Sequence, residues 1–128
     1  MTREFSRHKP IYKQIMEHIC QDIVRGVYVC GNKLPSVREL AIEVGVNANT
    51  IQRVYQELER DEIVVSKRGQ GTFITEDEER INVLKEEMKK EIVQRFITDM
   101  MKMGFTYDEM LTTIKEEAKN GDSSESSL

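Results

Sequence analysis

The sequence predicts a mainly α-helical fold of the α+β class: three short helices and a β-hairpin, followed by a small C-terminal region of two helices. Apolar residues recur at helical spacing in five segments, which indicates five amphipathic helices. Two short β-branched runs flank a turn that contains glycine, which indicates a hairpin. The length of 128 residues suits one domain, or one domain with a small appendage.

The first helix is expected over residues 11–24, where isoleucines recur every four residues and neighbouring apolar side chains widen the stripe. Pro10 stands at its first turn, where the missing N–H group costs little. Gly26 follows the last apolar residues and ends the helix. Residues 27–35 then read as a loop that closes at a proline.

Two short helices are expected next. Ser36 and Glu39 form the pattern of a capping box, which opens the second helix, and Gly45 ends it. After a turn of a few residues, apolar side chains recur at i, i+3, i+4 and i+7 from Ile51, so a third helix is expected to run to about Asp61. Two short helices joined by a turn that contains glycine form a helix-turn-helix.

A β-hairpin is expected directly after the third helix. Residues 63–66 and 72–75 are β-prone, and residues 67–71 between them form a turn whose two glycines can supply positive φ. The lysine and arginine of this turn are expected to project outward. A hairpin that follows a helix-turn-helix makes a winged helix, which is expected to occupy residues 1–75.

Residues 76–119 are expected to form a two-helix dimerisation and effector region. A capping box at Thr75 opens the fourth helix, which at about 1.5 Å per residue reaches roughly 40 Å. Because its own chain cannot cover that length, its apolar stripe is expected to pair with a second copy. The residues expected to dimerise are Ile81, Leu84, Met88, Ile92, Phe96 and Met100.

The fourth helix is expected to end at Gly104, and a further capping box, Thr106 with Glu109, opens a shorter fifth helix. Residues 120–128 are rich in serine, glycine and acidic residues and have almost nothing to bury. They are therefore expected to be a disordered tail.

The net charge of −4 hides a difference between the two halves of the chain. Residues 1–75 hold 11 Lys and Arg against 9 Asp and Glu, a net +2, whereas residues 76–128 hold 8 against 14, a net −6. A positive front half with an acidic rear half favours a nucleic-acid binder with a separate assembly segment. No apolar run approaches a membrane span and no secretory signal is visible, so a cytoplasmic location is expected.

Residues that carry catalysis or bind metals are not clustered. His8 and His18 lie ten residues apart without clustered carboxylates, and Cys20 and Cys30 are too few for a disulfide framework. The sequence contains no Walker loop, dinucleotide fingerprint or recognisable pairing of nucleophile and base. It therefore predicts a protein that is not an enzyme, that uses no cofactor or metal, and whose cysteines are reduced thiols.

One face of the third helix carries only amides and arginines, at Asn49, Arg53, Gln56 and Arg60. Amides can make bidentate contacts to adenine, and arginines can contact guanine or phosphate, so this face suits the major groove of double-stranded DNA. An ordinary solvated helix face is the alternative, but the preceding glycine turn and the following cationic hairpin favour DNA. Asn47 points toward the buried side instead and is expected to cap the helix.

The other cationic side chains have two possible roles each. Arg38 can reach a phosphate or form a surface ion pair with a nearby glutamate. Lys67 and Arg68 can enter the minor groove or bind the DNA backbone, or they can merely discourage edge-to-edge aggregation of the hairpin. A winged-helix module that binds protein rather than specific DNA is therefore the alternative function.

Residues 33–75, KLPSVRELAIEVGVNANTIQRVYQELERDEIVVSKRGQGTFIT, closely resemble the winged-helix half of GntR-type bacterial transcription regulators. The Asn-x-Asn-Thr motif, RGQGTF at the wing and the short two-helix C-terminal part resemble the YtrA subfamily. The resemblance implies a homodimeric repressor bound to an inverted-repeat operator, often of a transporter operon. The residues expected to bind DNA are Ser36, Arg38, Asn47, Asn49, Thr50, Gln52, Arg53, Gln56, Lys67, Arg68, Gly69, Gln70, Gly71 and Thr72.

The chain also departs from its relatives. Many of them carry arginine at the positions of Ala48 and Gln52, so their base preference does not transfer directly. Glu62 replaces the usual glycine before the wing, and that position must tolerate a side chain or adopt another conformation. Two helices alone cannot enclose a metabolite pocket, so any small-molecule effector is expected at the dimer interface or at its junction with the winged helix.

Overall fold

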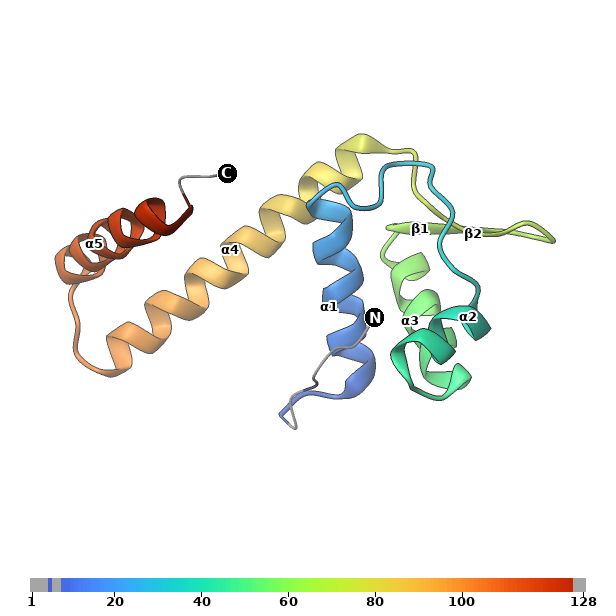
Figure 1. The fold of residues 1–128 in the computed structure, drawn as a ribbon, viewed down its shortest axis with the longest axis horizontal. Coiled ribbons are helices and arrows are strands. Elements are labelled where there is room, and N and C mark those ends of the chain that lie inside the picture. Colours follow the sequence, from blue (N-terminus) through green and yellow to red (C-terminus); the bar gives the residue numbers. More distant parts are fainter. Residues whose placement is uncertain (1–4, 6–7, 126–128) are drawn as a thin grey trace. The chain divides into compact units, whose positions relative to one another are not determined.

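The computed structural model describes residue 5 and residues 8–125, and it confirms the mainly α-helical fold with one hairpin (Figure 1). The elements in chain order are α1 (Ile11–Val24), α2 (Val37–Val44), α3 (Ala48–Arg60), β1 (Val64–Lys67), β2 (Gly71–Ile74), α4 (Glu78–Lys102) and α5 (Tyr107–Glu125). The chain divides into two compact units, residues 1–86 and residues 87–128. The division falls within α4, whereas the sequence suggested a boundary at residue 75.

The core of the first unit is built around α3, which packs against both α1 and α2. Ile51, Val54 and Leu58 of α3 are completely buried, which confirms the apolar face expected from their spacing. Burying side chains of this size stabilises a fold by roughly 1.5–3 kcal/mol each, so α3 is fixed firmly by its inner face. The opposite face of the same helix remains at the surface of this unit.

Local hydrogen bonds explain where α2 begins and ends. The Ser36 hydroxyl accepts a hydrogen bond from the Glu39 N–H at 3.1 Å, and the Glu39 carboxylate accepts one from the Ser36 N–H at 3.0 Å. This confirms the expected capping box. The hydrogen bond from the Ser36 backbone N–H lowers the pKa of Glu39. The stabilisation from this bond is therefore fully present above the ordinary glutamate pKa and is lost as pH falls through the lowered pKa. Gly45 ends the helix with φ of +79°.

The two strands of the hairpin have the expected length of four residues but lie one residue closer to the turn than the sequence indicated. β1 and β2 are antiparallel, with register from Val64 opposite Ile74 to Lys67 opposite Gly71, so the connecting loop has only the three residues 68–70. Residues 27–35 are also not a plain loop. Lys33 forms a β-bridge with Phe73, and the Leu34 N–H donates to the Thr72 carbonyl at 2.8 Å. This segment therefore lies along β2 on the edge opposite β1 and anchors the wing to the helices.

Glu62 resolves the departure noted at the start of the wing, because it adopts the left-handed conformation with φ of +62°. A side chain in that region costs about 1–2 kcal/mol relative to glycine, part of which is offset because glycine loses more freedom on folding. We therefore expect Glu62→Gly to raise the free energy of unfolding by about 0.5–1 kcal/mol. Urea denaturation of the two proteins measures the difference, and a destabilised glycine variant would contradict this reading of the turn.

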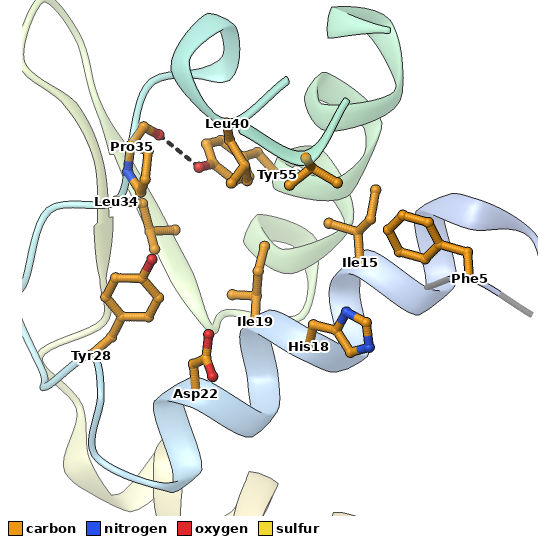
Figure 2. A pocket seen from close by; sticks show the side chains of 11 residues that line it. Phe5, Ile15, His18, Ile19, Asp22, Tyr28, Leu34, Pro35, Leu40 and Tyr55 are labelled. Atoms are coloured by element: carbon orange, nitrogen blue, oxygen red, sulfur yellow. Dashed lines mark hydrogen bonds between the residues drawn. The ribbon is translucent and has the colours of Figure 1, made fainter. Parts of the chain in front are cut away.

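A hydrogen bond joins α3 to the segment before α2 and so holds the two helices of the helix-turn-helix together. The Tyr55 hydroxyl donates to the Pro35 carbonyl at 2.6 Å (Figure 2). Burial raises the pKa of Tyr55 well above its ordinary value, so the hydroxyl stays protonated as the donor.

Removing this hydroxyl tests the contribution of the bond. We expect Tyr55→Phe to lower the free energy of unfolding by about 1–2 kcal/mol, because the Pro35 carbonyl is left without its donor in a partly buried site. Urea denaturation measures this change. Unchanged stability would mean that water replaces the hydroxyl without loss.

The beginning of α4 is part of the first unit. The Asp77 carboxylate accepts a hydrogen bond from the Arg80 N–H at 3.2 Å and caps the helix, whereas Thr75 accepts one from the Asp77 N–H. The capping box expected at Thr75 is therefore wrong by two residues. The Arg80 side chain donates to the Asp61 carbonyl at 2.9 Å, which ties α4 to the end of α3.

Leu84 is the main correction to the expected dimerisation residues. Its side chain is only 7% exposed in a single copy of the chain, and Leu84 lies in the part of α4 that belongs to the first unit, so it is not available to a second copy. Periodicity alone could not distinguish burial within the chain from burial in a dimer. A charge at Leu84 is therefore a test of folding and not of assembly.

In the second unit, the remainder of α4 leads through Gly104 into α5. Thr106 and Glu109 form the expected capping box, with distances of 3.0 and 3.2 Å between backbone nitrogen and side-chain oxygen. Helix α5 continues to Glu125, so residues 120–125 are helical and the expected disordered tail is corrected there. Residues 126–128 lie outside the described part of the chain. None of the described helices is long and apolar enough to cross a membrane.

Candidate nucleic-acid interface

The outward face of α3 presents polar side chains without an intervening acid. Asn49, Gln52, Arg53 and Gln56 are exposed, and Thr50 beside them is half-buried. Arg60, at the end of the helix, forms an ion pair with Glu57. The amide-rich first two turns are therefore the part of this face that can offer hydrogen bonds to base edges.

The two asparagines at the start of α3 have different roles within the fold. The Asn47 side-chain oxygen accepts a hydrogen bond from the Asn49 N–H at 2.8 Å, which confirms Asn47 as the N-cap. The Asn49 side chain is exposed on the outer face. The structure thus separates one amide that holds the helix entrance from one whose donor and acceptor face outward.

The turn between α2 and α3 is hollowed. A shallow hollow of about 480 Å³ is lined by Arg38, Ala41, Ile42, Gly45, Val46, Asn47 and Ala48. Ile42 is 76% exposed, and Ala48 is also exposed on this surface. Arg38 in the first turn of α2 is exposed, as is the N-cap residue Ser36, whose hydroxyl is already engaged in the cap.

The Arg53 side chain is not free in solvent. Its guanidinium carbon lies 3.7 Å from the centroid of the Tyr12 ring, which belongs to the first turn of α1. Such a contact combines the attraction of a cation to the ring face with stacking of two planar groups. This contact could not be predicted from the sequence, because 41 positions separate the two residues in the chain.

The wing carries its cations in two arrangements. Arg68 and Gln70 flank Gly69 at the tip, where all three residues are exposed and Gly69 has φ of +77°. The Lys67 ammonium instead lies 4.7 Å from the centroid of the Phe73 ring. Lys67 is paired in the ladder and does not belong to the turn.

Lys33 is a cation that the sequence analysis missed. A side chain at Gly71, where φ is +120°, would meet the Lys33 Cε atom at 2.8 Å, so the glycine makes room for the lysine stem. Because the end of a lysine side chain can move, the positive φ is the stronger requirement for glycine at this position. Thr72, half-buried next to it, offers its carbonyl to Leu34. The polar Lys33 followed by the apolar Leu34 and then a proline could have indicated a short edge strand, since Lys33 is exposed and Leu34 is buried.

A second hollow lies on the opposite side of the helix-turn-helix and does not fit a metabolite. Figure 2 shows Ile15, Ile19, Leu34, Leu40 and Tyr55 converging on it from α1, α2, α3 and the connecting segment. Its free volume is about 20 Å³, enough for one water molecule, whereas small-molecule sites have roughly 300–1,000 Å³.

Two further observations concern the cysteine thiol of α1 and possible metal ligands. Burial raises the pKa of the Cys20 thiol to about 12, so this cysteine is an inert core residue. Among the described residues, no three His, Cys, Asp or Glu side chains are grouped to hold a metal ion.

A three-helix unit with an exposed polar helix and an adjoining cationic hairpin defines a winged helix-turn-helix protein of the nucleic-acid-binding class. Residues 11–74 match the family described as "Bacterial regulatory proteins, gntR family". The chain belongs to this GntR family, and the expected membership is confirmed. The proteins of the family that it resembles are transcriptional regulators.

Two relatives from Bacillus subtilis illustrate the similarity. The chain is 46% identical over 121 residues to the HTH-type transcriptional regulator YhcF, covering 94% of this chain and all of YhcF. It is 40% identical over 90 residues to the HTH-type transcriptional repressor YtrA, covering 66% of this chain and 69% of YtrA. The expected likeness to YtrA is therefore confirmed.

Solved structures agree with this assignment. A GntR family transcriptional regulator from Listeria monocytogenes superimposes with a TM-score of 0.84 at 45% identity, covering 88% of this chain and 98% of that protein. The DNA-binding domain of AraR, solved in complex with its operator ORX1, superimposes with a TM-score of 0.54 at 26% identity, covering 59% and 95%. This domain of AraR is therefore an operator-binding domain with a similar fold.

Proposed function

We propose that this protein is a sequence-specific transcriptional repressor that binds an inverted-repeat operator as a homodimer. The observation that carries the proposal is the acid-free polar face of α3, with Asn49 outward and Asn47 held as its cap. An exposed amide at the start of a helix that protrudes from a rigid core is the arrangement that reads bases in the major groove.

The remaining groups suit contacts with the DNA backbone. With the start of α3 in the major groove, Ser36 at the N-cap of α2 and Arg38 within α2 would face the flanking phosphates. Arg68 with Gly69 at the wing tip would approach the minor groove. Lys67 beside the wing turn, and Lys33 whose side chain approaches Gly71, would add positive charge along the same backbone. Binding should therefore weaken steeply with salt, because each neutralised phosphate releases counterions.

The homodimer is supported by apolar side chains of the second unit that this chain leaves uncovered. On α4, Ile92, Phe96 and Met103 are exposed and fall within about 40° of one another around the helix, and Leu111 and Ile114 are exposed on α5. An exposed apolar line of this kind marks an interface. A second copy is the occupant we propose, since two identical winged helices would then address the two halves of an inverted repeat.

Repression is proposed because YtrA, a relative of similar length, is named as a repressor. A dimer covering an operator within a promoter would exclude polymerase without further chemistry, in the cytoplasm where the DNA lies. Control of a transporter operon is the context we propose. A small-molecule effector, if the protein uses one, would bind where the apolar surfaces of two copies meet, because the hollow within the first unit is too small.

Gel-shift assays with the DNA upstream of the protein's own gene test this proposal. The expected result is a retarded complex that survives excess random competitor DNA and that weakens as salt rises. Equal affinity for every sequence, or no salt-sensitive complex, would exclude the repressor and favour a module that binds protein.

A further inference from the structure

Tyr12 on α1 lies under the Arg53 guanidinium, and this contact connects the first helix with the DNA-facing surface of α3. We propose that Tyr12 is a positioning residue for DNA binding: its ring holds Arg53 at the edge of the recognition surface, where the guanidinium clamps a backbone phosphate. The proposal rests on the DNA-binding function proposed above and assigns Arg53 to phosphate instead of base contact.

The contact with Tyr12 shows that the Arg53 side chain does not extend straight outward from α3. The side chain starts on the face of α3 opposite the buried Ile51, Val54 and Leu58, yet its guanidinium lies against a ring that belongs to α1. A guanidinium drawn to the flank of a helix in the major groove meets the sugar-phosphate backbone, because the bases lie in front of the helix and the backbones on either side.

The contact also leaves the guanidinium able to bind an anion. Arginine presents five N–H donors in one plane, and a ring that contacts the face of this plane does not use the donors at its edge. Two such donors match the spacing of two phosphate oxygens. Stacking on Tyr12 therefore restricts the flexible side chain before DNA arrives without removing the groups that would bind it.

Preorganisation gives the ring its effect on affinity. An arginine side chain that is mobile in the free protein loses rotamer freedom when it binds, and an arginine already held in place loses less. Tyr12 is half-buried and Arg53 is exposed, so the rigid partner is the tyrosine and the restrained partner is the arginine. The prediction is that Tyr12 acts on DNA only through Arg53.

A double-mutant cycle on the full-length protein tests this prediction. Fluorescence anisotropy measures the dissociation constants of wild type, Arg53→Ala, Tyr12→Leu and the double variant for a selected binding site and for an unrelated duplex. We expect Arg53→Ala to weaken binding to both duplexes about ten-fold and to reduce the salt slope by about one. Tyr12→Leu should weaken binding about two- to five-fold when Arg53 is present and should have no effect when Arg53 is absent.

Two further variants separate positioning from folding. Tyr12→Phe keeps the ring and should retain affinity within about two-fold, whereas Tyr12→Met keeps apolar packing without the ring and should repeat the loss seen with leucine. Circular dichroism melting verifies that each variant is folded. If leucine unfolds the protein, the methionine variant completes the cycle.

The outcomes distinguish this inference from the function on which it rests. A loss from Tyr12→Leu that is equal in both Arg53 backgrounds would overturn it, as would a loss in Arg53→Ala confined to one base pair of the selected site. In either case wild type still binds DNA and the proposed function stands. A wild type without salt-sensitive binding to DNA would overturn both.

Discussion

Replacing Ile92 with glutamate is expected to convert a dimer into monomers and to lower affinity for an inverted repeat by about 100-fold or more. Ile92 is 66% exposed on α4 in the second unit, so a charge there leaves the fold of a single copy intact. In a dimer the same carboxylate would be buried against apolar side chains without a partner, which costs several kcal/mol. The second half-site would then no longer be held at high effective concentration.

Light scattering gives the mass of each variant, and anisotropy gives its affinity. Gln94→Glu is the matched control, because residue 94 is exposed and stands two positions along α4, about 200° around the helix from Ile92. It adds the same charge on the opposite face and should keep both dimer mass and affinity. A dimer of unchanged mass for Ile92→Glu would refute the proposed interface.

Replacing Asn49 with alanine should remove about 1–3 kcal/mol of discrimination at one base pair of each half-site. The reason is that the exposed side-chain amide of Asn49 can donate one hydrogen bond and accept another at the edge of a single base. The backbone N–H of Asn49 is not available to DNA, because it already donates to the Asn47 side chain. Affinity for unrelated DNA should hardly change. Binding to a panel of single-base variants of a selected site measures this loss directly.

Asn47→Ala is the control for this prediction, since it removes the neighbouring amide. It should lower stability by about 1 kcal/mol through loss of the cap and should weaken all duplexes alike. The assignment of Asn49 to base contact and Asn47 to the helix cap is wrong if Asn49→Ala weakens binding to specific and random DNA equally. It is also wrong if Asn47→Ala changes the base preference.

Features with local causes could be read from the sequence. The capping box at Ser36, the cap at Asn47 and the buried stripe of α3 depend on residues a few positions apart, and the structure confirms all three. The cap of α4 was misplaced because Thr75 and Asp77 are both plausible caps, and only the folded chain shows which side chain meets the free N–H of Arg80.

Features that depend on distant parts of the chain could not be read. The contact between Tyr12 and Arg53 joins two helices, and the room that Gly71 leaves for Lys33 depends on how the edge segment meets β2. The burial of Leu84 likewise depends on the start of α4 being part of the first unit. Periodicity identifies an apolar face without identifying what covers it.

The central claim is that the winged helix reads a specific DNA sequence as a dimer. Its most direct measurement is the affinity of the protein for a site selected from random DNA, compared with a single half-site and a scrambled duplex across a range of salt concentrations. We expect the selected site to be an inverted repeat that is bound at least about 1,000-fold more tightly than the scrambled duplex, and we expect the affinity for all three duplexes to fall as salt rises. Selection of no common sequence, or equal affinity for selected and scrambled DNA, would contradict it.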